Sequence, residues 1–437
     1  MSDTAIELPK IPRDKDYEDY LCAYMQAGGL FVERSIIHRQ KAELLELDII
    51  VTQYSKDSAG QTLVEIKGGK WGAGDIFKIK GWMTYLNLEA GSLIVQSRVD
   101  HMDFYASKAK ELGITLIDNS DLTSTKQALA GLLRVKPDEA EIETIRFAYL
   151  MERKMLSQIK ALKKKDIKSG GGLECFKQLD AYWFKANSDS FFSRTHLERI
   201  TQLCNHYVQH RNISARVCNE LAGGKYGEDV GMLSQACFRE TFYEAKDSLI
   251  QVSLHIEHIA RITIMSSVIG HVVSEGSKQD GQVDLYQILS MLSLPRSVES
   301  GIREIRNDEF FHLYPHFWQF FTYVFGGFIL LDLKDQEYEI LSKNTGIPVN
   351  HIDKAFKVFD KIFPRAKPWL SQLPNTTILA HTFFSPAIAG LGANYRRLKY
   401  VNGKDYDELY KKLTGRHTDY DLNKWNNLAY KRLTTKY

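Results

Sequence analysis

The pattern of apolar residues changes near Pro137, and this change limits what the chain can fold into. Before Pro137, short β-rich runs alternate with helical segments. After it, strand-like alternation nearly disappears and a period of about 3.6 residues continues to the end. The pattern therefore predicts an α/β domain over residues 1–135, followed by a larger all-α region over residues 138–437. Within that region we expect helices at residues 139–163, 195–208, 238–273 and 352–363.

A basic and then glycine-rich stretch, residues 163–172, interrupts the helical region. It predicts an exposed, flexible joint, with a second boundary near residues 165–172.

Residues 1–135 carry the signals of a mixed sheet flanked by helices. The expected order is helix, three strands, helix, strand, helix, strand. The first helix ends at Gly28-Gly29, and Asp75 is expected to be the N-cap of the second. The expected helices cover residues 17–27, 75–88 and 100–111, and the expected strands cover residues 30–36, 46–53, 62–68, 92–97 and 114–118.

The second and third strands are joined by a turn-rich run, residues 54–60, and should form an antiparallel hairpin. With the turn centred near residues 56–57, the numbers of opposed residues sum to about 113, which places Asp48 opposite Glu65. Because strand side chains alternate between two faces, Lys67 shares a face with Glu65. Asp48, Glu65 and Lys67 should therefore converge. The other face carries apolar residues that can pack under a helix: Ile49, Val51, Val64 and Ile66.

Two carboxylates that face each other in the middle of a hairpin repel, and a divalent cation removes that repulsion. Mg²⁺ is usually held by one or two carboxylates plus waters, and Mn²⁺ accepts the same oxygen ligands. A metal held by Asp48 and Glu65 can polarise a phosphate and lower the pKa of a bound water. Lys67 beside it can stabilise charge on the phosphate. The alternative is an exposed, salt-bridged strand face without catalysis.

These elements and residues resemble the PD-(D/E)xK nuclease superfamily, in particular its Mrr-like and Holliday-resolvase-like branches, over about residues 10–120. The metal-binding Asp of the family matches Asp48, and its (D/E)xK motif matches Glu65-Ile66-Lys67. The family often has a Glu in the first helix, which matches Glu18, with Asp19 as a rival. The Pro that commonly precedes the Asp is missing. The resemblance implies a restriction-endonuclease-like fold and a Mg²⁺- or Mn²⁺-dependent endonuclease that acts on DNA.

The residues after the motif suit contacts with a DNA backbone. Lys70, Trp71, Lys78 and Lys80 lie in or just before the second helix. Phosphate contacts from such lysines position a duplex but read no sequence. Lys78 and Lys80 cannot share one helical face, so one of them can equally be a solvated side chain.

The helical region contains weaker signals. Residues 339–359 resemble a helix-turn-helix, with an echo at residues 287–305, but an ordinary pair of helices is the commoner structure. Arg306, Asn307 and His312 match the R-N-x4-H pattern of HEPN ribonucleases, for which a structural role is the alternative.

Two pairs of histidines and a basic tail complete these signals. We assign no structural metal to His206 with His210 or to His255 with His258, because no third ligand is suitably spaced. The tail, residues 395–437, holds eleven Lys and Arg against five Asp and Glu, with interleaved tyrosines that suit either nucleic acid or a solvated face.

Composition excludes other classes of protein. The 437 residues are 44% hydrophobic and 25% charged with a net charge of +3, which excludes a mainly disordered chain and a uniformly basic coat. The longest apolar run, residues 317–331, is shorter than the about 20 residues that span a bilayer, so we predict a buried helix and no membrane partner. Five cysteines without a CxxC pair, and an N-terminus without a signal-peptide pattern, predict a reduced, cytoplasmic protein.

Two hypotheses of function follow. The first is a DNA endonuclease in restriction or anti-phage defence, whose helical region recognises the substrate or a partner protein of a defence system. One cutting site per chain would suit a homodimer for double-strand breaks. The second is a non-catalytic nucleic-acid-binding or sensor protein on a nuclease-like scaffold, and the intact Asp48, Glu65 and Lys67 set argues against it.

Overall fold

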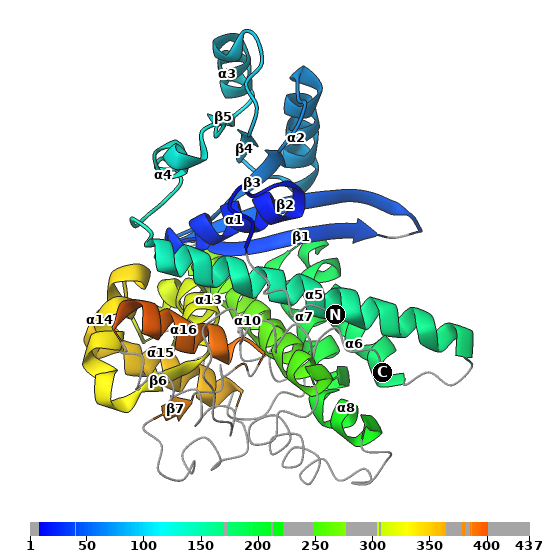
Figure 1. Ribbon diagram of the computed structural model, residues 1–437, viewed down its shortest axis with the longest axis vertical. Helices are drawn as coiled ribbons and strands as arrows, with labels where there is room; N and C mark the ends of the chain where they lie inside the picture. The colour runs from blue at the N-terminus through cyan, green and yellow to red at the C-terminus, as the bar shows by residue number, and fades with distance from the viewer. Residues whose placement is uncertain are drawn as a thin grey trace.

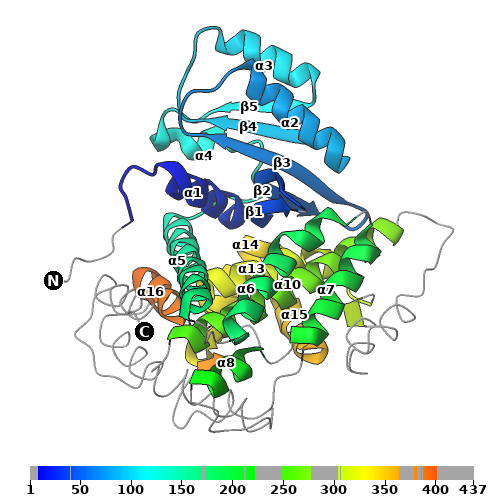
Figure 2. The same ribbon diagram turned by 90° about the vertical axis from the view of Figure 1, so that its right-hand side faces the viewer.

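A computed structural model describes residues 8–39, 41–169, 174–193, 195–210, 213–221, 248–276, 304–305, 307–363, 378–380, 385 and 387–400. In these residues a five-stranded mixed sheet is followed by a mainly helical region, as predicted. Figures 1 and 2 show the sheet standing on the layer of helices, with β1 nearest to them and β5 farthest away.

The sheet has the strand order β1-β2-β3-β4-β5, and it contains every strand expected before Pro137. β1, β2 and β3 are antiparallel neighbours, whereas β3, β4 and β5 are parallel. The parallel pairs need crossover connections, which α2 and α3 supply. The strands are β1 (Phe31–Arg39), β2 (Glu43–Tyr54), β3 (Ala59–Lys67), β4 (Ala90–Val95) and β5 (Ile114–Asp118). The helices are α1 (Asp14–Ala27), α2 (Ala73–Leu86), α3 (Met102–Glu111) and the short α4 (Thr125–Ala128), which follows the 3₁₀ turn η1 (Leu122–Ser124).

The β2–β3 hairpin has the predicted register. The pairs run from Ile49 with Val64 to Tyr54 with Ala59, and each pair sums to the predicted value. The cap of α2 differs from the prediction, because Gly72 is the N-cap and Asp75 lies three residues later. The Asp75 carboxylate accepts a hydrogen bond from the Gly72 N–H at 3.0 Å, so it closes the helix from within its first turn.

Each face of the sheet is covered by helices (Figure 2). On one face, α1 packs on the apolar residues predicted to lie under a helix, including Ile49 and Val64. On the other face, α2 and α3 pack on a second cluster that contains Leu63, Leu93 and Val95. Alternation along β2 and β3 produces this division, since successive side chains enter different cores.

Where the structure describes it, the helical region follows the predicted period, with two corrections; residues 238–247 of the helix expected at 238–273 lie outside the described part. The helix expected at 139–163 continues to Ser169, so most of the predicted joint at 163–172 is helical: its lysines are good helix formers and the first glycine comes only at residue 170. The region is also not purely helical, because β6 (Phe328–Leu330) pairs with β7 (Ile378–Ala380). The helices are α5 (Glu139–Ser169), α6 (Glu174–Asn187), α7 (His196–His210), α8 (Ile213–Leu221), α10 (Ser248–Gly276), α13 (Tyr314–Phe325), α14 (Lys334–Thr345), α15 (Val349–Ile362) and α16 (Ala389–Lys399), with 3₁₀ turns η2 (Asp189–Phe192), η4 (Phe311–Leu313) and η5 (Leu331–Leu333).

The sheet and the helical region share one hydrophobic core. Residues of α1 and β1 belong to the same buried cluster as residues of α5, α10 and α13. The edge of β1 is also covered: the Gln319 side chain of α13 accepts from the Val32 N–H at 2.9 Å and donates to the Val32 carbonyl at 2.7 Å. An edge strand normally exposes such groups, so Gln319 fixes the helical layer to the sheet.

The most apolar helices lie inside the protein. Every residue of α13 is buried, which confirms the buried helix over residues 317–325 of the apolar run. The rest of the run differs from the prediction, because Gly326 and Gly327 end the helix, β6 follows and Leu331 is exposed. Among the described residues, the segment Val252–Ser274 of α10 is long and apolar enough to cross a bilayer. In its most apolar stretch of 18 residues, 89% of the residues are buried in the protein. Core helices of globular proteins meet the same criterion.

Candidate active site

Asp48 lies where β2 parts from β3. The hairpin ladder ends at Ile49 with Val64, and Asp48 is the next residue of β2. Its Oδ2 accepts a hydrogen bond from the Ile66 N–H at 2.8 Å, so the carboxylate satisfies a β3 donor that the ladder no longer reaches. This bond holds Asp48 beside Glu65 and Lys67.

Glu65 is the most buried member of the group, with a side chain only 2% exposed. Its Oε1 accepts from Lys67 Nζ at 2.9 Å and from Lys78 Nζ of α2 at 2.8 Å. Its Oε2 is buried and has no hydrogen-bond partner in the part of the chain that the structure describes. Lys67 Nζ also lies 3.4 Å from Asp75 Oδ1, so two lysines compensate two acids here.

The surroundings of Asp48 and Glu18 disfavour the charged forms of these two carboxylates. Burial raises the pKa of Asp48 to about 7, and the nearby carboxylates of Glu65 and Glu18 add to the rise. Burial also raises the pKa of Glu18, although Lys15 opposes the change at 2.8 Å. Burial acts to lower the pKa of Lys67, but its contacts with Glu65 and Asp75 raise it overall, which keeps Lys67 charged.

These residues fit a divalent cation in one respect. The described residues contain no cluster of three or more His, Cys, Asp or Glu that could hold a metal by themselves. Mg²⁺, however, is commonly held by two carboxylates and several waters. A cation would stabilise the ionised form of Asp48, whose pKa is raised, and would give the unpaired Oε2 of Glu65 a partner.

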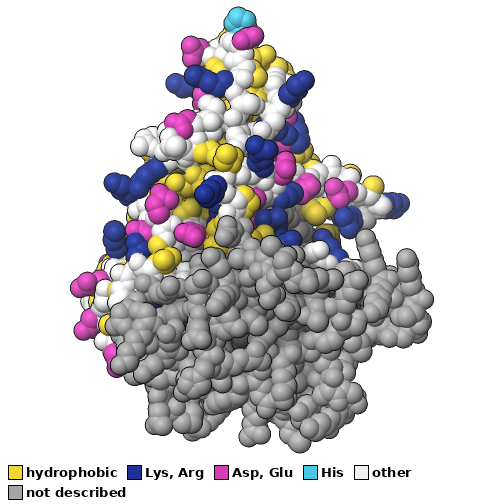
Figure 3. Space-filling model, viewed as in Figure 1, with side chains coloured by type: hydrophobic (Ala, Val, Ile, Leu, Met, Phe, Trp, Pro, Cys, Tyr) yellow, Lys and Arg dark blue, Asp and Glu magenta, His cyan; other side chains and the backbone are white. Residues whose placement is uncertain are grey.

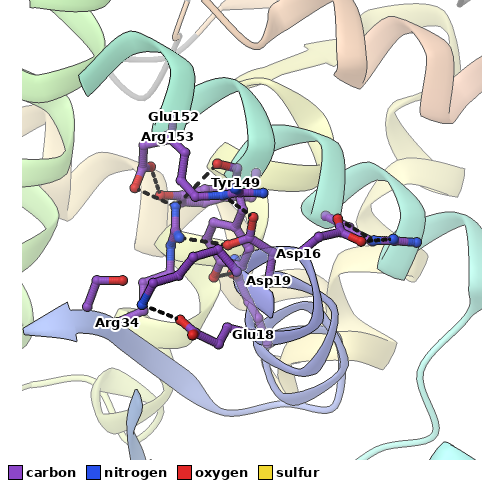
Figure 4. Close-up of polar contacts among 12 residues, drawn as sticks. Asp16, Glu18, Asp19, Arg34, Tyr149, Glu152 and Arg153 are labelled. Carbon is purple, nitrogen blue, oxygen red and sulfur yellow. Dashed lines mark hydrogen bonds and ion pairs between the residues drawn. The ribbon is translucent and has the colours of Figure 1, made fainter. Parts of the chain in front are cut away.

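Glu18 and Asp19 of α1, the two rival acids, have different surroundings. Asp19 is buried and accepts from Arg34 Nη1 at 2.8 Å and from Arg153 Nε at 2.6 Å. Arg34 also donates to Glu152 of α5 at 3.0 Å. Figure 4 shows this cluster between α1, β1 and α5, with Glu18 making a separate contact. Glu18, not Asp19, is therefore the acid of α1 that acts on Asp48.

The residues predicted to contact DNA also differ from one another. Trp71 is buried, with its indole N–H donating to the Ser97 carbonyl at 2.7 Å and its ring against Tyr105, and this burial disfavours the predicted DNA contact. Lys78 is partly committed to Glu65 and lies 4.0 Å from the centre of the Trp82 ring.

Lys70 is exposed and Lys80 is half-buried. On the face drawn in Figure 3, the Lys and Arg side chains lie among Asp and Glu side chains. Lys70 and Lys80 stay predictions as phosphate contacts.

Sequence reasoning missed the contacts that α2 and α1 make with the hairpin. Asp75 and Lys78 are three residues apart and so share a helical face, which was a signal that both could reach Lys67 and Glu65. Lys15, which contacts Glu18 and Glu46, had no comparable signal, because α1 is far from β2 in sequence.

The helix-turn-helix prediction corresponds to a pair of helices. α14 and α15 flank Gly346, whose φ of +77° ends α14. Lysines of α15 are engaged with acids: Lys354 with Asp308, and Lys361 with Glu304. Such pairing suits an ordinary helical hairpin. The echo at 287–305 lies almost wholly outside the described residues.

Of the residues in the predicted ribonuclease motif, the structure describes Asn307 and His312. His312 is buried in η4, and burial lowers its pKa, whereas Arg306 lies outside the described residues. The basic tail beyond residue 400 lies outside them as well.

The predicted histidine pairs sit in packed surroundings. His255 contacts Glu152 Oε2 at 3.1 Å and Ser385 Oγ at 2.9 Å, and His258 contacts Thr322 Oγ1 at 2.9 Å. His206 and His210 both pack against the ring of Tyr182.

Comparison of the chain with protein-family models, with curated proteins and with solved structures finds no match.

The raised pKa of Asp48 has a consequence for stability. Its folded-state pKa, about 7, lies above its ordinary value of 3.8, so ionised Asp48 is disfavoured in the folded state and stability is lost as the pH rises between these values. Asp48→Asn keeps an oxygen for the Ile66 N–H without the charge. In EDTA, the variant should be more stable than the parent by on the order of 1–3 kcal/mol at pH 8, and by less at pH 5.

Thermal melting at both pH values measures this difference. Asp100→Asn, which changes an exposed Asp of the same sheet region, is the matched control. An equal gain from Asp48→Asn at pH 5 and pH 8 would contradict the electrostatic explanation.

Proposed function

We propose that the chain is a Mg²⁺- or Mn²⁺-dependent endonuclease that hydrolyses phosphodiester bonds in DNA. Asp48 and Glu65 hold the metal, Lys67 acts on the phosphate, and Glu18 assists from α1. The proposal includes a restriction-endonuclease-like fold for the N-terminal part. The mixed sheet supports it, because an antiparallel hairpin carries the acids and the parallel strands follow.

One observation carries the proposal: the Asp48 and Glu65 carboxylates lie together on adjacent strands without full compensation. A protein that needed only a stable sheet would gain by replacing one of them, since like charges at such positions are destabilising. Instead Glu65 keeps a buried oxygen without a partner and Asp48 has a pKa of about 7. Perturbed acids that are grouped in this way favour a functional site over a structural one.

Lys67 and Lys78 have different roles in this mechanism. A bound divalent ion would polarise the phosphate and lower the pKa of a water molecule. Lys67 lies within 2.9 Å of Glu65 and remains charged, so it can stabilise negative charge that develops on the phosphate oxygens. Lys78 shares Glu65 Oε1 from α2 and holds that carboxylate in place, which leaves Oε2 for the metal.

The wider role is proposed by analogy with nucleases of this architecture. The helical region would recognise DNA or a partner protein, the setting would be restriction or anti-phage defence in the cytoplasm, and a homodimer would provide two cutting sites for a double-strand break.

The test is a plasmid-nicking assay with the full chain. Cleavage should require Mg²⁺ or Mn²⁺, stop in EDTA, and be weaker in Ca²⁺, whose larger and looser shell positions water poorly. Full cleavage in EDTA would overturn the proposed site. Absence of cleavage on plasmid, linear duplex and single-stranded DNA with either active metal would favour the non-catalytic alternative.

A further inference from the structure

A cavity separate from the carboxylate group lies between the sheet and the helical region. Its volume is about 650 Å³, within the range of small-molecule sites. It is lined by the end of α2, by β1, by η2 and by the first turn of α7. Tyr85 at its edge is 58% exposed, so the cavity is open to solvent there.

Aromatic rings form one wall of this cavity in a continuous row. The ring of Tyr85 lies 5.9 Å from that of His38, which stacks on Phe192 at 4.1 Å with an angle of 13° between the planes. Phe191 follows, 5.4 Å from Phe192. The Tyr85 hydroxyl and His38 Nδ1 lie 3.2 Å apart, which fixes the exposed end of the row. His38 and Phe192 cover one face of each other, and the exposed ring of Tyr85 extends this stack toward solvent, where a planar ligand can pack against it.

A cation stands at the inner end of the row. The Arg199 guanidinium lies 5.2 Å from the centre of the Phe191 ring and is ion-paired with Glu33. Arg199 is only 7% exposed, and its Nε has no hydrogen-bond partner in the described part of the chain. An anion in the cavity would complete the hydrogen bonding of this side chain.

The start of α7 lines the same end of the cavity, and its first turn carries one acidic residue, Glu198. Thr195, His196 and Arg199 all line the cavity, and the Thr195 hydroxyl accepts from the Glu198 N–H at 3.1 Å as the helix begins. The first turn of a helix favours negative charge through its free N–H groups and its dipole. The cavity thus has an aromatic side and an anion-binding end.

This cavity is distinct from the candidate active site. Gln61 of β3 lines it, whereas Glu65 is four residues further along the same strand, a separation of roughly 13 Å. Residues of the two sites also come from different turns of α2, with Lys78 near the middle of the helix and Tyr85 in its last turn.

We propose that this cavity binds a nucleotide, with the base against the Tyr85–His38–Phe192 row and the phosphate toward Arg199 and the start of α7. A purely apolar ligand would leave the Arg199 Nε–H unpaired, and a simple anion would make no use of the rings. The ligand is either a free nucleotide or one nucleotide of a nucleic-acid strand, and the two sources share the same chemistry.

Calorimetric titration of the full chain tests the site without any need for cleavage. The probes are AMP, GMP, CMP and UMP, each beside its nucleoside, and a single-stranded DNA of about twelve nucleotides. Tyr85→Ala should weaken binding of the best mononucleotide at least about fivefold through lost stacking. Phe77→Ala is the matched control, because Phe77 is an aromatic of the same helix, 66% exposed, that does not line the cavity.

The Arg199 end is tested by the double variant Glu33→Gln with Arg199→Gln, which removes both partners of the ion pair and so leaves no lone buried charge. It should abolish the preference for a nucleotide over its nucleoside while thermal melting shows a folded protein. If the double variant does not fold, the test is whether the parent protein binds a nucleotide more tightly than its nucleoside. Equal binding of nucleotide and nucleoside by the parent overturns the role of Arg199.

The source of the nucleotide follows from the two arms of the titration. If Tyr85→Ala loses binding of the mononucleotide but keeps binding of the DNA, the ligand is a free nucleotide. If it loses binding of the DNA, whether or not it also loses binding of the mononucleotide, the ligand is a nucleotide of a strand. The proposal is overturned if neither probe binds the parent at millimolar concentration, or if Tyr85→Ala and Phe77→Ala bind both probes alike.

Discussion

Asp48→Asn and Glu65→Gln should each lower the single-turnover rate of DNA cleavage by about a thousandfold or more, with the fold retained. Each change removes a ligand charge, and the loss of metal polarisation and of water activation is worth several kcal/mol in the transition state. Lys67→Ala should also abolish cleavage but leave metal binding largely intact, because an ammonium group is not a ligand. Glu18→Ala should be milder, since Glu18 acts on Asp48 from a neighbouring helix.

The measurement is single-turnover cleavage beside thermal melting with and without Mg²⁺. Lys70→Ala is the control, because Lys70 is an exposed lysine close to the same hairpin and should affect DNA binding more than the rate of the bound complex. Parent-like cleavage by Asp48→Asn or Glu65→Gln would show that this group is not the active site. Unchanged stabilisation by Mg²⁺ in both variants would show that it does not hold the metal.

Arg34→Ala should cost about 3–5 kcal/mol of unfolding free energy. Arg34 lies between Asp19 and Glu152, both nearly fully buried, and over the ring of Tyr149 at 4.1 Å. Although burial acts in the opposite direction, Arg34 and His255 hold the pKa of Glu152 at about 2. Without the guanidinium, a buried carboxylate loses its main partner.

Urea unfolding at neutral pH measures this cost. Arg39→Ala is the matched control on the same strand, because Arg39 pairs with Glu43 at the surface and should cost less than about 1 kcal/mol. Adding Glu152→Gln to Arg34→Ala should restore part of the loss, since it removes the unpaired charge. Similar costs for Arg34→Ala and Arg39→Ala would mean that the cluster is not stabilising.

The sheet could be predicted because its signals are local. Alternation along β2 and β3, and the turn between them, predict the observed register, and Asp48 and Glu65 are the residues that follow its last pair, Ile49 with Val64. The register prediction therefore needed no knowledge of the rest of the chain. The same reasoning identified the apolar face under α1.

Contacts between distant segments could not be predicted. Asp19 and Arg153 are far apart in sequence, and nothing near either residue shows that they meet. The burial of Trp71 could not be predicted for a similar reason, because it depends on Ser97 and Tyr105, which come later in the chain. β6 and β7 are too short for a periodic pattern to reveal.

Glu18 and Asp19 are neighbours on α1, and this proximity links two distant parts of the protein mechanically. Asp19 is tied through Arg153 to α5, whereas Glu18 acts on Asp48 at the end of the hairpin. Since adjacent residues of a helix move as one body, any shift of α5 that pulls Asp19 must also move Glu18. The position of Glu18 relative to Asp48 therefore depends on how α1 is held against α5, through the ion pair of Asp19 with Arg153.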